Sequence, residues 1–241
     1  MARKNGKDFI YLIWKEPKSR QQFVIAKLSK NGKYEFEYAP NIQQALDKGF
    51  IPFIAFNNIH KKYESDKLFT SFSSRIPDKR RKDINDILNR YGLSEYNEYE
   101  LLKKSGGRLP IDDLEFIDPI INNGENPIKR YFYIAGPRHY IGCEGKSCDK
   151  SINIEENESL KLELEPTNLY DKYAIKVCKK SGELIGYIPR YYSKELNDLI
   201  ASGWEYTINI YEINKKSNNC NECLKVVLNL KHDHDLNSKQ I

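Results

Sequence analysis

The feature that most constrains the fold is a stretch of strict alternation that ends abruptly. Leu160, Leu162 and Leu164 alternate with charged residues, and this period of two is typical of a strand with one buried face. The run Glu-Pro-Thr-Asn at 165–168 interrupts it, because proline cannot donate to a β ladder and asparagine favours turns. Strand character then resumes on both sides of a short turn at 180–182. The expected strands are 159–166, 173–178 and 184–188.

The break between the first two strands contains Asn168-Leu-Tyr-Asp171, where folding alone does not require a tyrosine. The run EPTNLYDKYAIKV, followed by IGYIPR, closely resembles the HIRAN domain. This resemblance implies a small, OB-like, partly open β-barrel with one helix over residues 129–231. It also implies capture of single-stranded DNA at its 3′ end. The predicted binding residues are Arg138, His139, Tyr140, Asn168, Tyr170, Asp171, Tyr187 and Arg190.

The chemistry of these residues suits a splayed nucleotide. An aromatic ring stacks on a base, an arginine pairs with a phosphate, and a carboxylate accepts a hydrogen bond from a sugar hydroxyl. A local structural interpretation stands beside it. In that interpretation Asp171 forms an Asx turn, the tyrosines fill the barrel, and Arg138 pairs with Glu165. The chain also departs from the family, which often has two aromatic residues after the arginine where this chain has His139 and Tyr140.

The remaining patterns of the second half agree with a small barrel. Alternating or apolar runs predict strands, and one amphipathic run predicts a helix that ends at Gly203. The strands are expected at 131–135, 206–213 and 224–230, and the helix at 193–202. A turn-rich linker at 122–128 and a disordered tail at 232–241 are expected to bound this domain.

The first half predicts an antiparallel sheet with short helices, so that the whole chain is α+β. A hairpin signal at Asn31-Gly32 joins two of its strands, and proline at 77 indicates the opening of a basic helix. Strands are expected at 9–14, 22–28, 34–38 and 50–56. Helices are expected at 41–48, 68–72, 79–91 and 98–104, the last ended by Ser105-Gly-Gly107.

Residues 9–120 also resemble the small N-terminal subdomain of HipA-type toxin kinases. The resemblance rests on SDKLFTSFSSRIPDKRRKDINDILNRYGL and on YELLKKSGGRLPIDDLEFIDP, where a Gly-Gly turn leads into a strand. It implies an accessory domain over 1–121, but the kinase body and its catalytic motifs are absent. The alternative function is therefore a bacterial, antitoxin-like module that binds a HipA-like kinase partner in a toxin–antitoxin system.

Charge is distributed unevenly along the chain. Residues 1–120 hold 22 lysines and arginines against 17 acidic residues, whereas residues 121–241 hold 17 of each. The second half thus lacks the broad basic face of a protein that follows many phosphates, which favours a small site. A basic cluster precedes the helix expected at 79–91, and it is either a solvated helix start or a secondary phosphate-binding patch. It consists of Arg75, Lys79, Arg80, Arg81 and Lys82.

The cysteines allow two interpretations. Cys143 and Cys148 form one pair, and Cys220 and Cys223 form a C-x-x-C pair in the expected turn of the last hairpin. Together they resemble a zinc-ribbon ligand set, so a structural zinc is one prediction; exposed thiols without metal are the other. Cys178 is expected to be packed in a strand.

No set of residues has the spacing of a catalytic site, so we expect a binding protein that is not an enzyme. No apolar run approaches the length of a membrane span, and the N-terminus lacks the apolar core of a signal peptide. These patterns predict a cytoplasmic protein without a required cofactor.

Overall fold

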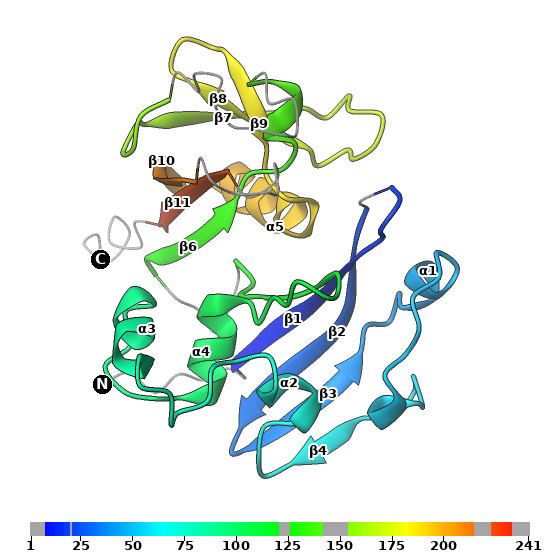
Figure 1. Ribbon diagram of the computed structural model, residues 1–241. Coiled ribbons are helices and arrows are strands. Elements are labelled where there is room, and N and C mark those ends of the chain that lie inside the picture. The colour runs from blue at the N-terminus through cyan, green and yellow to red at the C-terminus, as the bar shows by residue number, and fades with distance from the viewer. Residues whose placement is uncertain (1–7, 20, 121–125, 142–153, 215–222, 233–241) are drawn as a thin grey trace, which may run out of the picture. The chain divides into compact units, whose positions relative to one another are not determined.

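The computed structural model describes residues 8–19, 21–120, 126–141, 154–214 and 223–232. The chain forms two compact units, Met1–Gly124 and Glu125–Ile241. Each unit consists of antiparallel strands with a few short helices, so the predicted α+β class is confirmed (Figure 1).

The first unit is organised around a five-stranded sheet of order β4-β3-β2-β1-β5. Gly32, with φ +82°, makes the tight turn predicted between its second and third strands. The strand that the second resemblance places after the Gly-Gly turn is present and pairs with the first strand at the sheet edge. The strands are β1 (Asp8–Lys15), β2 (Gln22–Asn31), β3 (Lys33–Tyr38), β4 (Tyr63–Ser65) and β5 (Leu114–Ile117).

Short helices cover one side of this sheet and bury a cluster of aromatic rings against it. Phe36 of β3 lies at the centre, with ring centroids 4.3 Å from Phe56 and 5.3 Å from Phe72. The last helix begins at an asparagine cap and ends at Gly106, whose φ of +74° is typical of a helix C-terminus. The helical segments are α1 (Gln43–Leu46), the 3-10 turn η1 (Ile54–Phe56), α2 (Thr70–Ser73), α3 (Ile84–Arg90) and α4 (Glu98–Ser105).

Two predictions in this unit are wrong. Residues 50–56 do not form a strand, because Phe50, Phe53 and Phe56 turn inward with a spacing of three, and Ile51 and Ile54 are left exposed. The basic helix does not open at Pro77. It begins at Ile84, and the residues before it form turns.

The second unit holds two three-stranded antiparallel sheets of orders β7-β8-β9 and β10-β11-β6. Two isolated bridges, Ala135 to Tyr187 and Ser159 to Asn209, join the sheets without closing them within the described residues, as expected for a partly open barrel. The elements are β6 (Ile128–Tyr133), the 3-10 turn η2 (Pro137–His139), β7 (Leu160–Leu164), β8 (Ile175–Lys179), β9 (Leu184–Tyr187), α5 (Arg190–Ala201), β10 (Glu205–Ile213) and β11 (Leu224–Lys231).

Helix α5 closes the core of this unit. Its Tyr192 packs edge-on against Phe132 of β6, with ring centroids 5.2 Å apart, and Leu196 is fully buried. The unit extends slightly beyond its predicted limits, since Ile128 begins β6 and the backbone N–H of His232 donates to Asn126. Among the helices of the described part of the chain, none has the length and hydrophobicity needed to cross a membrane.

Candidate nucleic-acid site

The connection between β7 and β8 is held in shape by the side chain of Asn168. Its Oδ1 accepts the backbone N–H groups of Tyr170 and Asp171 at 2.9 and 3.1 Å. Asp171 continues the pattern, because its Oδ1 accepts the N–H of Tyr173 at 2.9 Å. The Asx turn considered for Asp171 is therefore present. These bonds fix the backbone and leave the Tyr170 ring in solvent, with 88% of the residue exposed.

Glu165 ties this loop to two strands. Its carboxylate accepts hydrogen bonds from the Asn168 Nδ2 at 2.7 Å and the Tyr187 hydroxyl at 3.1 Å. It also forms an ion pair of 2.8 Å with Lys176 of β8. Lys176, then Asn168 and Tyr187, lower the pKa of Glu165 from its ordinary value. The pairing considered between Arg138 and Glu165 is wrong, because Lys176 supplies the cation.

A pair of tyrosines connects Glu165 of this loop to the residue that follows η2. The rings of Tyr140 and Tyr187 lie with centroids 5.9 Å apart. Burial, and then hydrogen bonding with Tyr140 and Glu165, raises the pKa of the Tyr187 hydroxyl. Tyr140 is 40% exposed, so the pair is open to solvent on one side. The structure thus links Tyr140, Tyr187 and Asn168, three of the predicted residues, through contacts that end at Glu165.

A close backbone approach makes this arrangement possible. Ala135 and Tyr187 exchange two backbone hydrogen bonds of 2.7 and 2.9 Å, which fix the segment before η2 against the end of β9. Gly186 has φ +155°, and a Cβ there would lie 2.8 Å from the carbonyl oxygen of Ala135. Glycine is therefore required at this position for the two segments to meet.

The cations of the site lie at two exposed positions. Arg138 lies in η2, and its Nε–H donates to Nε2 of His139 at 3.1 Å. Arg190 is the first residue of α5 and is also exposed. Neither guanidinium forms an ion pair within the described residues, so both are available to phosphates. Three residues beside the predicted ones were not predicted from the sequence as part of the site: Glu165, Lys176 and Leu169, the last of which is 94% exposed beside Tyr170.

The five residues of the predicted secondary basic patch do not form one exposed group of free cations in the described part of the first unit. Arg75 is buried and forms a bidentate pair with Asp112, at 2.6 and 2.7 Å, so it cannot reach a phosphate. Arg80 and Arg81 are exposed but pair with Asp78 and Asp83. Only Lys79 and Lys82 remain as exposed members without an ion pair in the described part of the chain.

The zinc prediction falls mostly outside the described residues, which exclude Cys143, Cys148 and Cys220. Cys223 is fully buried, so the interpretation of its thiol as exposed is wrong. Cys178 is packed in β8 as expected, and burial raises the pKa of its thiol.

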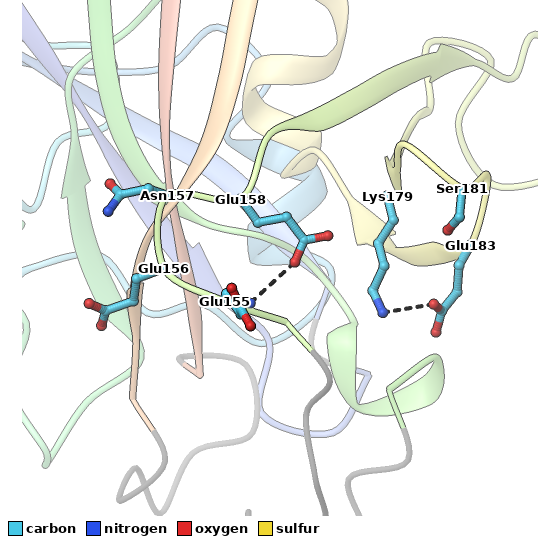
Figure 2. A pocket seen from close by; sticks show the side chains of 7 residues that line it. All are labelled: Glu155, Glu156, Asn157, Glu158, Lys179, Ser181 and Glu183. Atoms are coloured by element: carbon cyan, nitrogen blue, oxygen red, sulfur yellow. Dashed lines mark hydrogen bonds and ion pairs between the residues drawn. The ribbon is translucent and has the colours of Figure 1, made fainter.

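A separate pocket of about 580 Å³ lies beside the turn between β8 and β9, and Figure 2 shows its lining. The charged groups around it are four glutamates, at 155, 156, 158 and 183, and Lys179, which pairs with Glu183 at 2.8 Å. A site with this charge repels phosphate. None of the predicted binding residues lines it.

Comparison with known proteins bears on the second unit. Residues 129–231 match the HIRAN domain family, and they cover every strand and helix described in that unit except the first residue of β6. The second unit contains a HIRAN domain. Among solved structures, the HIRAN domain of human HLTF is 20% identical, over 42% of this chain and 72% of that one, with a TM-score of 0.31. A protein from Lactobacillus plantarum is 18% identical, over 44% of this chain and 99% of that one, with a TM-score of 0.33.

No curated protein matches the chain. The comparisons give no support to the resemblance between residues 9–120 and the HipA-type kinases, nor to a HipA-like partner. Within the HIRAN domain, the motif that identified the family from sequence is the same loop and strand pair that Glu165 and Asn168 organise.

We expect replacement of Glu165 by glutamine to loosen this loop without unfolding the unit. The neutral amide loses the ion pair with Lys176, and hydrogen exchange at the Tyr170 and Asp171 amides should accelerate severalfold. The melting temperature should change little, because partly exposed ion pairs contribute little to stability. The matched control is Glu163→Gln, which removes a similar pair with Lys161 on β7.

The Glu165 carboxylate should also make the protection of the Tyr170 and Asp171 amides depend on pH. The pKa of Glu165 is lowered in the folded protein. The stabilisation that its carboxylate gives to the loop is therefore complete above the ordinary glutamate pKa and is lost as pH falls through the lowered value. Protection of the two amides should fall over that acidic range in the parent protein. A similar fall in Glu165→Gln would contradict the role assigned to this carboxylate.

Proposed function

We propose that this protein binds single-stranded DNA through its HIRAN domain and captures the 3′ end, without catalysing a reaction. HIRAN domains are DNA-binding modules, which supports nucleic-acid binding in general. The observation that favours an end site is the loop at 165–174, which displays Tyr170 beside a carboxylate. The equal numbers of basic and acidic residues in the second half favour a small site over a long groove.

Each residue has a defined role in this proposal. Tyr170 stacks the terminal base, and Arg138 and Arg190 hold the nearby phosphates. Asp171 accepts a hydrogen bond from the terminal sugar hydroxyl. Its Oδ1 is used by the Tyr173 amide, whereas its Oδ2 makes no hydrogen bond within the described part of the chain and can accept one. A carboxylate beside a phosphate chain repels it, so this position suits a strand end with a free hydroxyl.

Replacement of Asp171 by alanine tests the end capture directly. The parent protein should bind a strand with a 3′ hydroxyl more tightly than one with a 3′ phosphate and more tightly than a circular strand. Asp171→Ala should remove the preference for the hydroxyl and leave affinity for the 3′-phosphorylated strand equal or higher, because a repulsive charge is lost. Fluorescence anisotropy with the three oligonucleotides measures all of these affinities.

Asp198→Ala is the control, since Asp198 is an exposed carboxylate on α5 and its loss changes net charge equally. This variant should keep the parent's preference. Equal binding of linear and circular strands by the parent would reject end capture. Absence of binding to every oligonucleotide would reject nucleic-acid binding as a whole.

A further inference from the structure

The solvent side of the sheet β10-β11-β6 displays tyrosines and lysines together. Side chains of β6 alternate, so that Ile128, Arg130 and Phe132 are buried while Lys129 and Tyr131 are exposed. Tyr131 lies opposite Val227 of β11, and Tyr133 lies opposite Lys225. This tyrosine–lysine face is defined as Lys129, Tyr131, Tyr133, Tyr211 and Lys225.

A β-bulge completes the face. The register between β10 and β11 shifts between Ile210 and Glu212, so Tyr211 is the extra residue of its strand. Its ring lies against that of Tyr131, with centroids 4.8 Å apart, and the two residues are 48% and 45% exposed. Bulges commonly re-aim a side chain in this way.

The lysines of the face lie over its rings. The Lys129 ammonium is 5.3 Å from the centroid of Tyr131, and the Lys225 ammonium is 5.6 Å from Tyr133 and 5.8 Å from Tyr211. Neither lysine forms an ion pair within the described residues. Cation–π contacts at exposed sites are weak, so a ligand that offers both an anion and a stacking surface can displace them.

The core of the unit does not need these rings. Phe132, Val226, Leu228 and Ile208 fill the opposite side of the same three strands and are buried. Exposed aromatic surface grouped in one place is uncommon on a soluble domain and indicates a binding surface. Polyanionic single strands match it, because successive bases stack on tyrosines and backbone phosphates pair with lysines.

We infer that a captured strand continues from its 3′ end onto the tyrosine–lysine face, with bases on Tyr131 and Tyr211 and phosphates on Lys129 and Lys225. This rests on the proposed function of the end site. The two places are joined by the chain, since β6 leads into η2 and only four residues lie between Tyr133 and Arg138. The five steps along the chain from Tyr133 to Arg138 span at most about 18 Å, which is a distance that a few nucleotides can cover.

The acidic residues on these strands limit where the bound DNA strand can run across the sheet. Glu205 lies opposite Lys231 at one end of the sheet, and Glu212 lies opposite Lys225 beside the bulge. Phosphates are therefore favoured near β6 and disfavoured towards the outer edge of β10. The path should be short, in agreement with the even charge balance of the second half of the chain.

The test compares strands of about 4 and about 12 nucleotides with free 3′ hydroxyls, within the range of OB-type site sizes. The parent should bind the longer strand more tightly. Tyr131→Leu/Tyr211→Leu should lower affinity for the longer strand about tenfold and leave the shorter strand unchanged. Tyr131→Phe/Tyr211→Phe, which keeps the rings, should bind both strands as the parent does.

The two lysines are tested separately, through the salt dependence of binding. Lys129→Gln/Lys225→Gln should reduce the slope of log affinity against log salt by about 1.4 for the longer strand, at about 0.7 per phosphate contact. The control pair Lys48→Gln/Lys180→Gln removes the same charge from exposed positions elsewhere and should leave the slope unchanged.

The results of these binding measurements distinguish failure of this inference from failure of the proposed end site. If the parent binds both lengths equally, or if the leucine variant keeps full affinity for the longer strand, the face does not contact the strand and only this inference fails. If the leucine variant weakens both lengths equally, the face acts on the fold or on the end site, and the inference also fails. If the parent binds neither strand, the proposed function itself is wrong.

Discussion

Replacement of Tyr170 by alanine should weaken binding of single-stranded DNA by about tenfold or more. Stacking of a base on an aromatic side chain contributes about 1–3 kcal/mol, and about 1.4 kcal/mol corresponds to a factor of ten. The ring is 88% exposed on a loop fixed by Asn168, so its removal should leave the free energy of unfolding unchanged. Anisotropy with a 3′-hydroxyl strand, beside urea unfolding, measures both effects.

Two controls make this result specific. Tyr170→Phe keeps the stacking surface and should bind within about twofold of the parent, because the hydroxyl has no assigned role. Ile111→Ala removes an equally exposed side chain from the first unit, also 88% exposed, and should have no effect. Parent-like binding by Tyr170→Ala would remove the central contact of the proposed site.

Replacement of Arg75 by alanine should give the largest loss of stability, about 3 kcal/mol in the first unit. The guanidinium donates to both carboxylate oxygens of Asp112, to the Gly107 carbonyl at 2.7 Å and to the Leu114 carbonyl at 3.3 Å. Its side chain is 5% exposed, so the variant leaves acceptors without a donor in a region that water reaches poorly. Asp112 is 29% exposed, which places the loss at the lower end of the range for a broken buried pair.

Urea unfolding followed by a probe of the first unit should show a lower midpoint with an unchanged slope. Arg80→Ala is the matched control, because Arg80 makes a similar bidentate pair with Asp78 but is exposed, and its loss should not be measurable. Binding of single-stranded DNA by folded Arg75→Ala should equal that of the parent. A weaker salt dependence of binding in this variant would indicate that Arg75 contacts phosphate, and it would contradict the purely structural role assigned to this residue.

The sequence by itself determined the strands of the second unit and the backbone turns of the loop at 165–174. Alternation over 160–164 predicts a strand because successive side chains point to opposite faces, and β7 occupies these residues. The loop was predictable because its determinants are local: Asn168 and Asp171 bond to amides two or three residues away. A family motif of this length also led to Tyr170 and Asp171 as proposed binding residues without any knowledge of distances.

The tertiary structure decided what depends on residues far apart in the chain. Arg75 belongs to a basic run in sequence, yet it is buried because Asp112, 37 residues later, supplies two acceptors. Glu165 follows a regular strand, and only the approach of Tyr187 and Lys176 makes it the centre of the site. Residues 50–56 are apolar enough for a strand, but packing of the phenylalanines around Phe36 imposed a different spacing.

The tyrosine–lysine face shows the same division. Alternation predicts that Tyr131 lies on one side of its strand, but it does not say which strand lies beside it. The ring of Tyr211 reaches Tyr131 only because a bulge shifts the register of β10 against β11. A local pattern therefore sets which face a side chain occupies, whereas pairing between distant strands sets its neighbours, because register depends on contacts that no short window of sequence contains.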